Sequence, residues 1–148
     1  MSKGQTLATA ESCTGGWVAQ AVTSVAGCSD WFERGYVTYS NAAKREALGV
    51  PKKTLLRHGA VSEQTARAMA QGALRKSRAH LALAITGIAG PGGGSPDKPV
   101  GLTYVALADG RGGDVRRYIW GLDRSGNKRA SAGAALDFVL ERLETGPT

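Results

Sequence analysis

A serine and a lysine in this sequence could together perform nucleophilic chemistry. Ser12 lies in the turn ESCTGG (residues 11–16), between a short apolar run and a segment with helical spacing. Backbone N–H groups at the start of a helix can hold a phosphate or a developing oxyanion, and two glycines let a ligand approach the backbone closely. Ser12 is therefore a candidate nucleophile. The alternative, which the capping preference of serine and threonine alone favours, is that Ser12 or Thr14 only caps the following helix.

Lys44 could supply the base that a serine nucleophile needs. The two histidines, His58 and His80, lie in polar or helix-end contexts and are poorly placed for this role. A lysine acts as a base only when it is neutral, which requires a lowered pKa. Lys44 follows the expected helix cap Asn41 by three residues, and both the positive end of a helix and burial would lower its pKa. Tyr39 could relay a proton or position a substrate. Without further information, a solvated helical lysine and an ordinary strand tyrosine are the simpler interpretations.

Cys13 is a rival nucleophile, because thiolates at helix N-termini are activated. It is one of only two cysteines, which are too few for a disulfide framework and lack the histidine neighbours of a zinc site. We therefore expect no metal and no cofactor. The two glycine-rich turns, residues 12–16 and 87–94, carry neither the Gly-Lys-Ser/Thr of a nucleotide triphosphatase nor the Gly-x-Gly-x-x-Gly of a dinucleotide site. Both turns follow apolar runs, where open α/β sheets bind ligands.

The elements that must position these residues alternate between strands and helices. Strands are predicted over residues 5–10, 36–40, 81–88, 100–108 and 115–120, and helices over residues 17–26, 42–48, 52–57, 63–78 and 129–143. Ser62 is the expected N-cap of the 63–78 helix. In the last helix, the residues expected to point inward are Ala135, Leu136, Val139, Leu140 and Leu143. This order predicts one domain over residues 1–148, an α/β sandwich with a mixed sheet.

The composition is that of a globular protein whose partners are anionic. Of the 148 residues, 42% are hydrophobic and 21% charged, and the net charge is +7. There is no apolar run of about 20 residues and no signal-peptide pattern, so we expect a cytoplasmic location and no membrane partner. No helix-turn-helix or zinc-finger pattern is present, which argues against nucleic acid as the partner. Because the first strand starts so early, one sheet face could lack a covering helix, and we expect a homo-oligomer.

Four motifs resemble the CinA C-terminal domain family. They are TAESCTGG (residues 9–16), GYVTYSN (residues 35–41) with Lys44 three residues on, HGAVS (residues 58–62) and GIAGP-x-GG (residues 87–94), and they follow in order over the whole chain. The resemblance implies a three-layer α/β/α sandwich with a mixed five-stranded sheet. Since family members include nicotinamide-mononucleotide amidohydrolases, it also implies conversion of nicotinamide mononucleotide to nicotinic acid mononucleotide and ammonia in pyridine-nucleotide recycling. A chain of 148 residues has no room for the N-terminal domain of longer relatives, so the stand-alone form is expected.

The resemblance also implies roles for individual residues. Ser12, Lys44 and Tyr39 match the catalytic serine, lysine and tyrosine, so a neutral Lys44 would deprotonate Ser12 and an acyl-enzyme would form. The small phosphorylated nucleotide would be bound by Glu11, Cys13, Thr14, Gly15, Gly16, Asn41, Thr86, Gly87, Gly90 and Gly93, with Arg124 or Arg129 on the phosphate. One departure is the run GLDR at residues 121–124, where relatives have Pro-Gly-Asp-Arg. The alternative function is a non-catalytic nucleotide-binding or regulatory module linked to competence or DNA damage.

Overall fold

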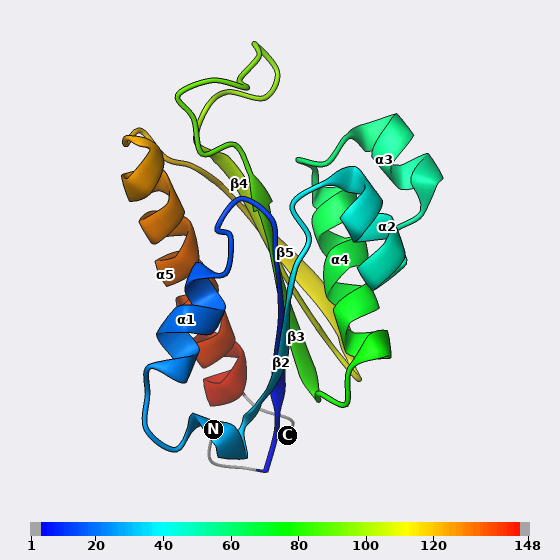
Figure 1. Ribbon diagram of the computed structural model, residues 1–148, viewed down its shortest axis with the longest axis vertical. Helices are drawn as coiled ribbons and strands as arrows, with labels where there is room; N and C mark the ends of the chain where they lie inside the picture. Colours follow the sequence, from blue (N-terminus) through cyan, green and yellow to red (C-terminus); the bar gives the residue numbers. More distant parts are fainter. Residues whose placement is uncertain (1–3, 146–148) are drawn as a thin grey trace.

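Five strands form one mixed sheet in the order β2–β1–β3–β4–β5 (Figure 1). The structure, a computed structural model, describes residues 4–145. The strands are β1 (Leu7–Glu11), β2 (Phe32–Val37), β3 (Leu81–Gly87), β4 (Leu102–Asp109) and β5 (Gly112–Ile119). Strand β1 pairs parallel with β2 and β3, whereas β4 runs antiparallel to both β3 and β5. The predicted mixed five-stranded sheet is therefore confirmed.

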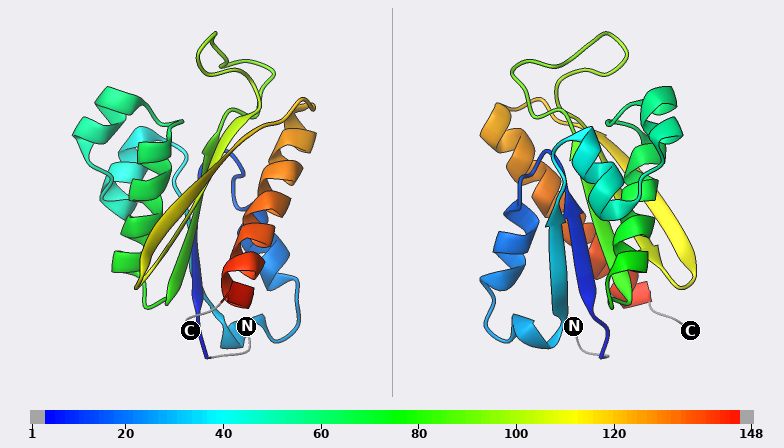
Figure 2. Two further views of the ribbon diagram at one scale, coloured as in Figure 1. Left: turned by 180° about the vertical axis from the view of Figure 1, so that it is seen from behind. Right: turned by 45° about the vertical axis from the view of Figure 1, so that its right-hand side comes forward.

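Helices cover both faces of this sheet, which gives the three predicted layers. They are α1 (Trp17–Thr23), α2 (Asn41–Leu48), α3 (Lys52–His58), α4 (Glu63–Lys76) and α5 (Arg124–Thr145), with a short 3₁₀ turn η1 (Cys28–Asp30). Helices α1 and α5 lie on one face, and α2, α3 and α4 lie on the other (Figure 2).

The two faces have cores of different character. Alternate residues of β3 point to opposite sides, so Leu83 packs with α1 and α5 while Ala82 and Ala84 face α4. Small side chains on the α4 side let that helix approach the sheet closely. Gly72 of α4 has the same role toward α2, because a Cβ at this position would lie 1.9 Å from the carbonyl oxygen of Leu48.

Two predictions around the second helix are wrong. The N-cap of α2 is Ser40, not Asn41: Ser40 has extended backbone and its Oγ accepts a hydrogen bond from the N–H of Ala43 at 3.0 Å. The strand predicted over residues 36–40 instead spans Phe32–Val37. It ends there because its partner β1 ends at Glu11, so the last backbone bond runs from the Thr38 N–H to Glu11. Residues 38–40 turn across the end of the sheet instead.

The last helix also differs from its prediction. It begins at Arg124 rather than residue 129, because the Asp123 carboxylate accepts a hydrogen bond from the N–H of Gly126 at 2.7 Å. A glycine in the first turn hides this start from a periodicity argument. Leu140, expected inward, is 57% exposed, while Ala135 and Val139 are buried as predicted. The N-cap Ser62 of α4 is confirmed by its bond from the Thr65 N–H, although that helix ends at Lys76.

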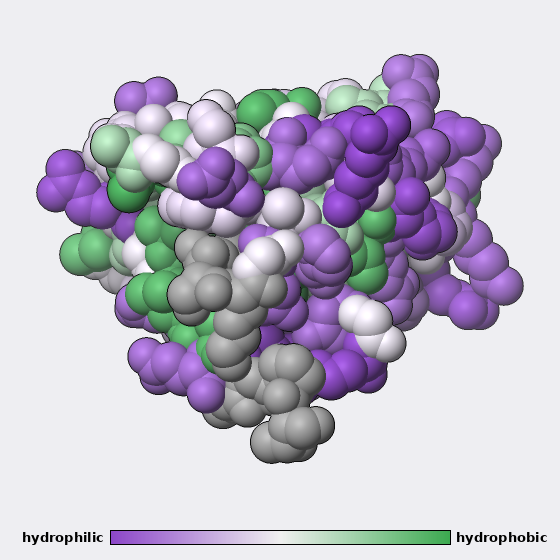
Figure 3. Space-filling model, turned by 90° about the horizontal axis from the view of Figure 1, so that it is seen from below, coloured by the Kyte–Doolittle hydropathy of each residue, from purple (hydrophilic) through white to green (hydrophobic). Residues whose placement is uncertain are grey.

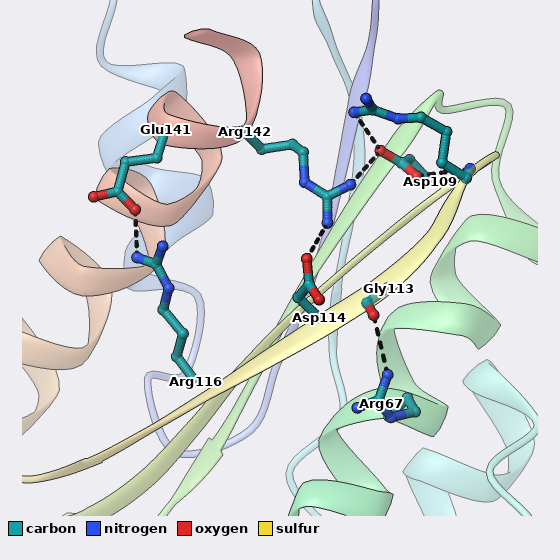
Figure 4. Close-up of polar contacts among 8 residues, drawn as sticks. Arg67, Asp109, Gly113, Asp114, Arg116, Glu141 and Arg142 are labelled. Carbon is teal, nitrogen blue, oxygen red and sulfur yellow. Dashed lines mark hydrogen bonds and ion pairs between the residues drawn. The ribbon is translucent and has the colours of Figure 1, made fainter. Parts of the chain in front are cut away.

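The C-terminal half of α5 is fastened to the β4–β5 hairpin by ion pairs (Figure 4). The guanidinium of Arg142 contacts Asp109 at 2.8 Å and Asp114 at 2.7 Å, and Arg116 contacts Glu141 at 2.5 Å. These pairs hold one end of α5 against the hairpin. The other end of the helix, which begins at Arg124, lies at the opposite end of the sheet, beside the loop of residues 88–101 (Figure 1).

An apolar groove of about 620 Å³ lies between α1, α5 and the start of β1, and its walls include Val22, Trp31, Leu136 and Val139. Figure 3, which views this end from below, shows apolar side chains gathered on the side of α1 and α5. The expectation that one sheet face lacks a covering helix near the first strand is wrong, because every residue of β1 is buried and Leu7 packs against α1 and α5. Among residues 4–145, no helix combines the length and apolarity needed to cross a bilayer.

Candidate active site

A cavity of about 240 Å³ lies at the carboxyl ends of the parallel strands β1 and β3. The ESCTGG turn follows β1, the glycine-rich loop follows β3, and α2 and α5 begin at the same end (Figure 1). Predicted site residues that line this cavity are Ser12, Cys13, Tyr39, Lys44, Thr86, Gly87, Gly90, Gly93 and Arg124. The fold therefore brings together residues that are up to 112 positions apart, Ser12 and Arg124 being the most distant.

Lys44 reaches this cavity from the first turns of α2 and meets Ser12. Its Nζ lies 3.0 Å from the Oγ of Ser12, and it donates hydrogen bonds to the backbone carbonyls of Thr38 at 2.9 Å and Tyr39 at 3.0 Å. Lys44 is only 1% exposed, and no carboxylate among the described residues contacts its Nζ. Because burial disfavours the charged form, the pKa of Lys44 is lowered from that of an exposed lysine.

A neutral amine can satisfy all three partners of Lys44. A neutral amine has two N–H bonds and one lone pair. With the two N–H groups donated to the carbonyls of Thr38 and Tyr39, the lone pair remains for the Ser12 hydroxyl. The unusual path of residues 38–40 supplies both carbonyls, so the early end of β2 is what orients the lysine.

Glu11 holds the turn in place rather than lining the cavity. Its carboxylate accepts hydrogen bonds from the Thr14 hydroxyl at 2.6 Å, the Val18 N–H at 2.9 Å and the Ala19 N–H at 3.1 Å. The N-cap residue of α1 is Gly16, which makes no side-chain cap. Glu11 therefore caps α1 from the end of β1, and the alternative that Ser12 or Thr14 only caps this helix is wrong. The Ser12 hydroxyl remains available to Lys44.

Backbone N–H groups of the ESCTGG turn follow directly after the candidate nucleophile. Gly15 and Gly16 have positive φ values of 62° and 105°, which glycine adopts without strain. The N–H of Gly15 donates to the Ser12 carbonyl at 3.1 Å, so it is already used. Within residues 4–145, no backbone carbonyl accepts from the N–H groups of Cys13, Thr14 and Gly16, and these are the turn's candidate donors for an oxyanion.

Cys13 lines the same cavity but is not activated. Burial raises the pKa of the Cys13 thiol to about 11, so it is protonated near neutral pH. A thiol is a much weaker nucleophile than a thiolate, and the structure favours Ser12 over this rival.

The loop after β3 closes the other side of the cavity. Thr86 donates to the carbonyl of Ala60 at 2.8 Å, and a Cβ on Gly87 would lie 2.8 Å from the carbonyl oxygen of Leu102. At the mouth, Arg124 donates to the carbonyl of Gly90 at 2.7 Å and to the hydroxyl of Tyr39 at 3.4 Å. The first residue of α5 thus joins this loop to the segment that carries Tyr39.

Other predicted site residues do not line the cavity. Glu11, Thr14, Gly15 and Gly16 build the turn behind it, and Asn41 lies exposed in the first turn of α2. Arg129 is also exposed and does not line the cavity, so Arg124 is the one of the two arginines at the mouth. Sequence reasoning missed Ala60 and Val61, which line the cavity from the HGAVS motif. The signal that could have found them is the HGAVS motif itself, because it is one of the four motifs that carry the family resemblance.

Comparison with known proteins agrees with this architecture. The profile described as the CinA C-terminal domain matches residues 1–143. The nicotinamide-nucleotide amidohydrolase PncC of Escherichia coli K12 is 53% identical over 143 residues, which are 96% of this chain and 87% of that protein. The competence/damage inducible protein CihA of Agrobacterium tumefaciens has a solved structure with a TM-score of 0.88 and 48% identity, covering 93% of this chain and 85% of that one.

A second solved structure is similar at lower identity. The competence-damaged protein (CinA) superfamily protein of Klebsiella pneumoniae 700603 has a TM-score of 0.93 at 35% identity, covering 97% of this chain and 89% of that one. The shared fold, the profile match and the near-complete overlap lead to one conclusion: this chain belongs to the CinA C-terminal domain family.

Proposed function

We propose that this protein is an amidohydrolase that converts nicotinamide mononucleotide to nicotinic acid mononucleotide and ammonia. The observation that carries the proposal is the 3.0 Å contact between the Nζ of a buried Lys44 and the Oγ of Ser12, with no carboxylate beside the amine in the described chain. A relative with 53% identity is named a nicotinamide-nucleotide amidohydrolase, which indicates the substrate.

In the acylation step, Lys44 takes the proton of the Ser12 hydroxyl while the Oγ attacks the carboxamide carbon. The carbonyl oxygen becomes an oxyanion, which the unused N–H groups of Cys13 and Thr14, directly after Ser12, would hold. The C–N bond then breaks. The ammonium form of Lys44 returns its proton to the leaving nitrogen, so ammonia departs and an ester on Ser12 remains.

In the deacylation step, water attacks this ester and Lys44 again acts as the base. The Ser12 Oγ leaves with the proton held by Lys44, and the carboxylic acid product loses its own proton to solvent to become the carboxylate. Tyr39 is the second group that could move a proton, because its hydroxyl lies at the cavity mouth beside Arg124. No net proton or electron is left on the enzyme after one cycle.

The test is ammonia release from nicotinamide mononucleotide by the full chain and its Ser12→Ala variant. We expect the wild type to release ammonia and Ser12→Ala to lose about three or more orders of magnitude in kcat. Ser29→Ala, which changes an exposed serine far from the cavity, is the matched control and should retain activity. If the wild type binds the nucleotide without releasing ammonia, the chain is a non-catalytic nucleotide-binding module and this proposal is wrong.

The proposal includes the cytoplasmic location and the self-association predicted from the sequence. The apolar groove between α1 and α5 is the surface at which a second copy would bury exposed side chains such as Val25 and Leu140. Sedimentation velocity over a range of protein concentrations tests this point. A monomer at every concentration would remove self-association from the proposal without touching the chemistry.

A further inference from the structure

The cavity lined by Ser12 and Lys44 is called the reactive cavity below. A second, more polar hollow adjoins it, and we call this second hollow the basic cleft. Its volume is about 530 Å³, and its walls include Arg57, His58, Lys98, Tyr104 and Arg117. Val61 lines both the basic cleft and the reactive cavity, so the two hollows adjoin at this residue.

The reactive cavity alone is small for a nucleotide. Its volume of about 240 Å³ is below the roughly 300–1,000 Å³ of typical small-molecule sites. A substrate whose carboxamide carbon reaches Ser12 must therefore extend beyond it. The basic cleft supplies adjoining space across Val61.

The cations of the basic cleft lack partners of opposite charge. Within residues 4–145, no carboxylate pairs with Arg57 or Arg117, and the Nζ of Lys98 donates to the carbonyl of His58 at 2.6 Å. The acidic wall residue is Glu63, and its carboxylate lies 3.9 Å from the guanidinium of Arg67. The cleft therefore has a net positive charge, which favours an anionic ligand.

Backbone donors reinforce this charge. Helix α4, with 14 residues, begins in the wall of the cleft. Ser62 caps the N–H of Thr65, which leaves the N–H groups of Glu63 and Gln64 in the first turn. The positive end of the helix and these donors favour an anion at the same place as the three cations.

Arg124 lies at the mouth of the reactive cavity and outside the basic cleft. Its guanidinium donates to Gly90 and contacts the Tyr39 hydroxyl, so it positions the walls of the reactive cavity. We propose that the basic cleft binds the phosphate of the mononucleotide through Arg57, Lys98 and Arg117, while the carboxamide lies at Ser12. This assignment rests on the function proposed above and replaces Arg124 and Arg129 as the phosphate ligands.

The experiment compares two substrates, nicotinamide mononucleotide and the riboside that lacks the phosphate, by ammonia release. In the double variant Arg57→Gln/Arg117→Gln, we expect KM for the mononucleotide to rise about 10- to 100-fold, since each lost contact with a charged group weakens binding about tenfold. We expect kcat for the mononucleotide and both constants for the riboside to stay within about twofold. Lys53→Gln removes an exposed charge from the same helix as Arg57 and should change nothing.

Three outcomes would overturn the assignment. An unchanged KM for the mononucleotide means that the phosphate does not lie in the basic cleft. An equal loss on both substrates means that the two arginines have only a structural role. A phosphate-selective rise in KM for Arg124→Gln, with none for the double variant, places the phosphate at the other side of the mouth.

Binding measured by calorimetry separates this proposal from the catalytic one. If the wild type releases no ammonia from either compound, the proposed reaction fails. The cleft assignment still predicts that the mononucleotide binds more tightly than the riboside and that the double variant removes this difference. Equal binding of the two compounds by the wild type contradicts it.

Discussion

The reactive cavity and the ion-pair cluster at the far end of α5 place basic side chains in opposite surroundings. Arg142 meets the carboxylates of Asp109 and Asp114, whereas Lys44 is buried beside two backbone carbonyls and the Ser12 hydroxyl. A carboxylate within reach favours the charged form, while burial without one favours the neutral form. The first arrangement fastens a helix to a hairpin. The second favours a neutral amine, which is the form that the proposed base requires.

The largest effect is expected where the charge of the buried lysine is made permanent. Arginine does not lose its proton in proteins. Lys44→Arg should therefore lower kcat by at least about 10³-fold, as for other losses of a catalytic base. Lys53→Arg makes the same exchange on an exposed lysine and should keep full activity. Turnover by Lys44→Arg within tenfold of the wild type would exclude Lys44 as the base.

Glu11 is buried like Lys44, but its carboxylate accepts three hydrogen bonds, whereas Lys44 has no counter-charge among the described residues. Glu11→Ala leaves the first N–H groups of α1 without an acceptor and should lower the free energy of unfolding by about 2–4 kcal/mol. Urea unfolding followed by circular dichroism measures this, with Glu46→Ala on the surface of α2 as the control. Equal stability of the two variants would mean that Glu11 does not cap α1.

The ion-pair cluster should respond in stability and not in chemistry. Arg142→Gln removes contacts with two carboxylates of which one is exposed, so the expected loss is about 1 kcal/mol of unfolding free energy. We expect kcat to stay unchanged, since the cluster lies at the end of the sheet opposite the cavity. Asp137→Asn, an exposed charge on the same helix, is the control. A fall in kcat without a fall in stability would mean that the ion-pair cluster acts on the chemistry of the reactive cavity, contrary to this account.

The smallest effect is expected at Cys13. Its thiol is protonated near neutral pH, because burial raises the pKa to about 11. Cys13→Ala should change kcat by less than about tenfold, since only packing at the cavity wall is altered. Loss of all turnover in this variant, together with turnover by Ser12→Ala, would make the cysteine the nucleophile.

The sequence predicts the frame of the molecule better than the contacts of the site. Alternating apolar runs and glycine-rich turns were enough to predict the mixed sheet and to place Ser12 at the end of a strand. The pairing of Ser12 with Lys44 spans 32 positions. Residue types alone left it open, the family resemblance favoured it, and the 3.0 Å contact supports it. Local patterns could not show that β2 stops with its partner or that Glu11 caps α1, because both depend on residues that meet only in the folded chain.

The basic cleft was hidden for the same reason. Arg57, Lys98 and Arg117 come from a helix, a loop and a strand, and each resembles a solvated surface residue in the sequence. Only the fold shows that they share one hollow beside the reactive cavity.

The most direct test of the account is the titration of Lys44 itself. Carbon-13 labelling of the lysine side chains allows the Cε resonance of Lys44 to be followed by NMR, with Lys44→Arg identifying the signal. The account predicts a midpoint below that of the exposed lysines, and the pH dependence of kcat/KM should rise through the same midpoint, because the neutral amine is the active form. A Lys44 that titrates together with the exposed lysines, or above them, would contradict it.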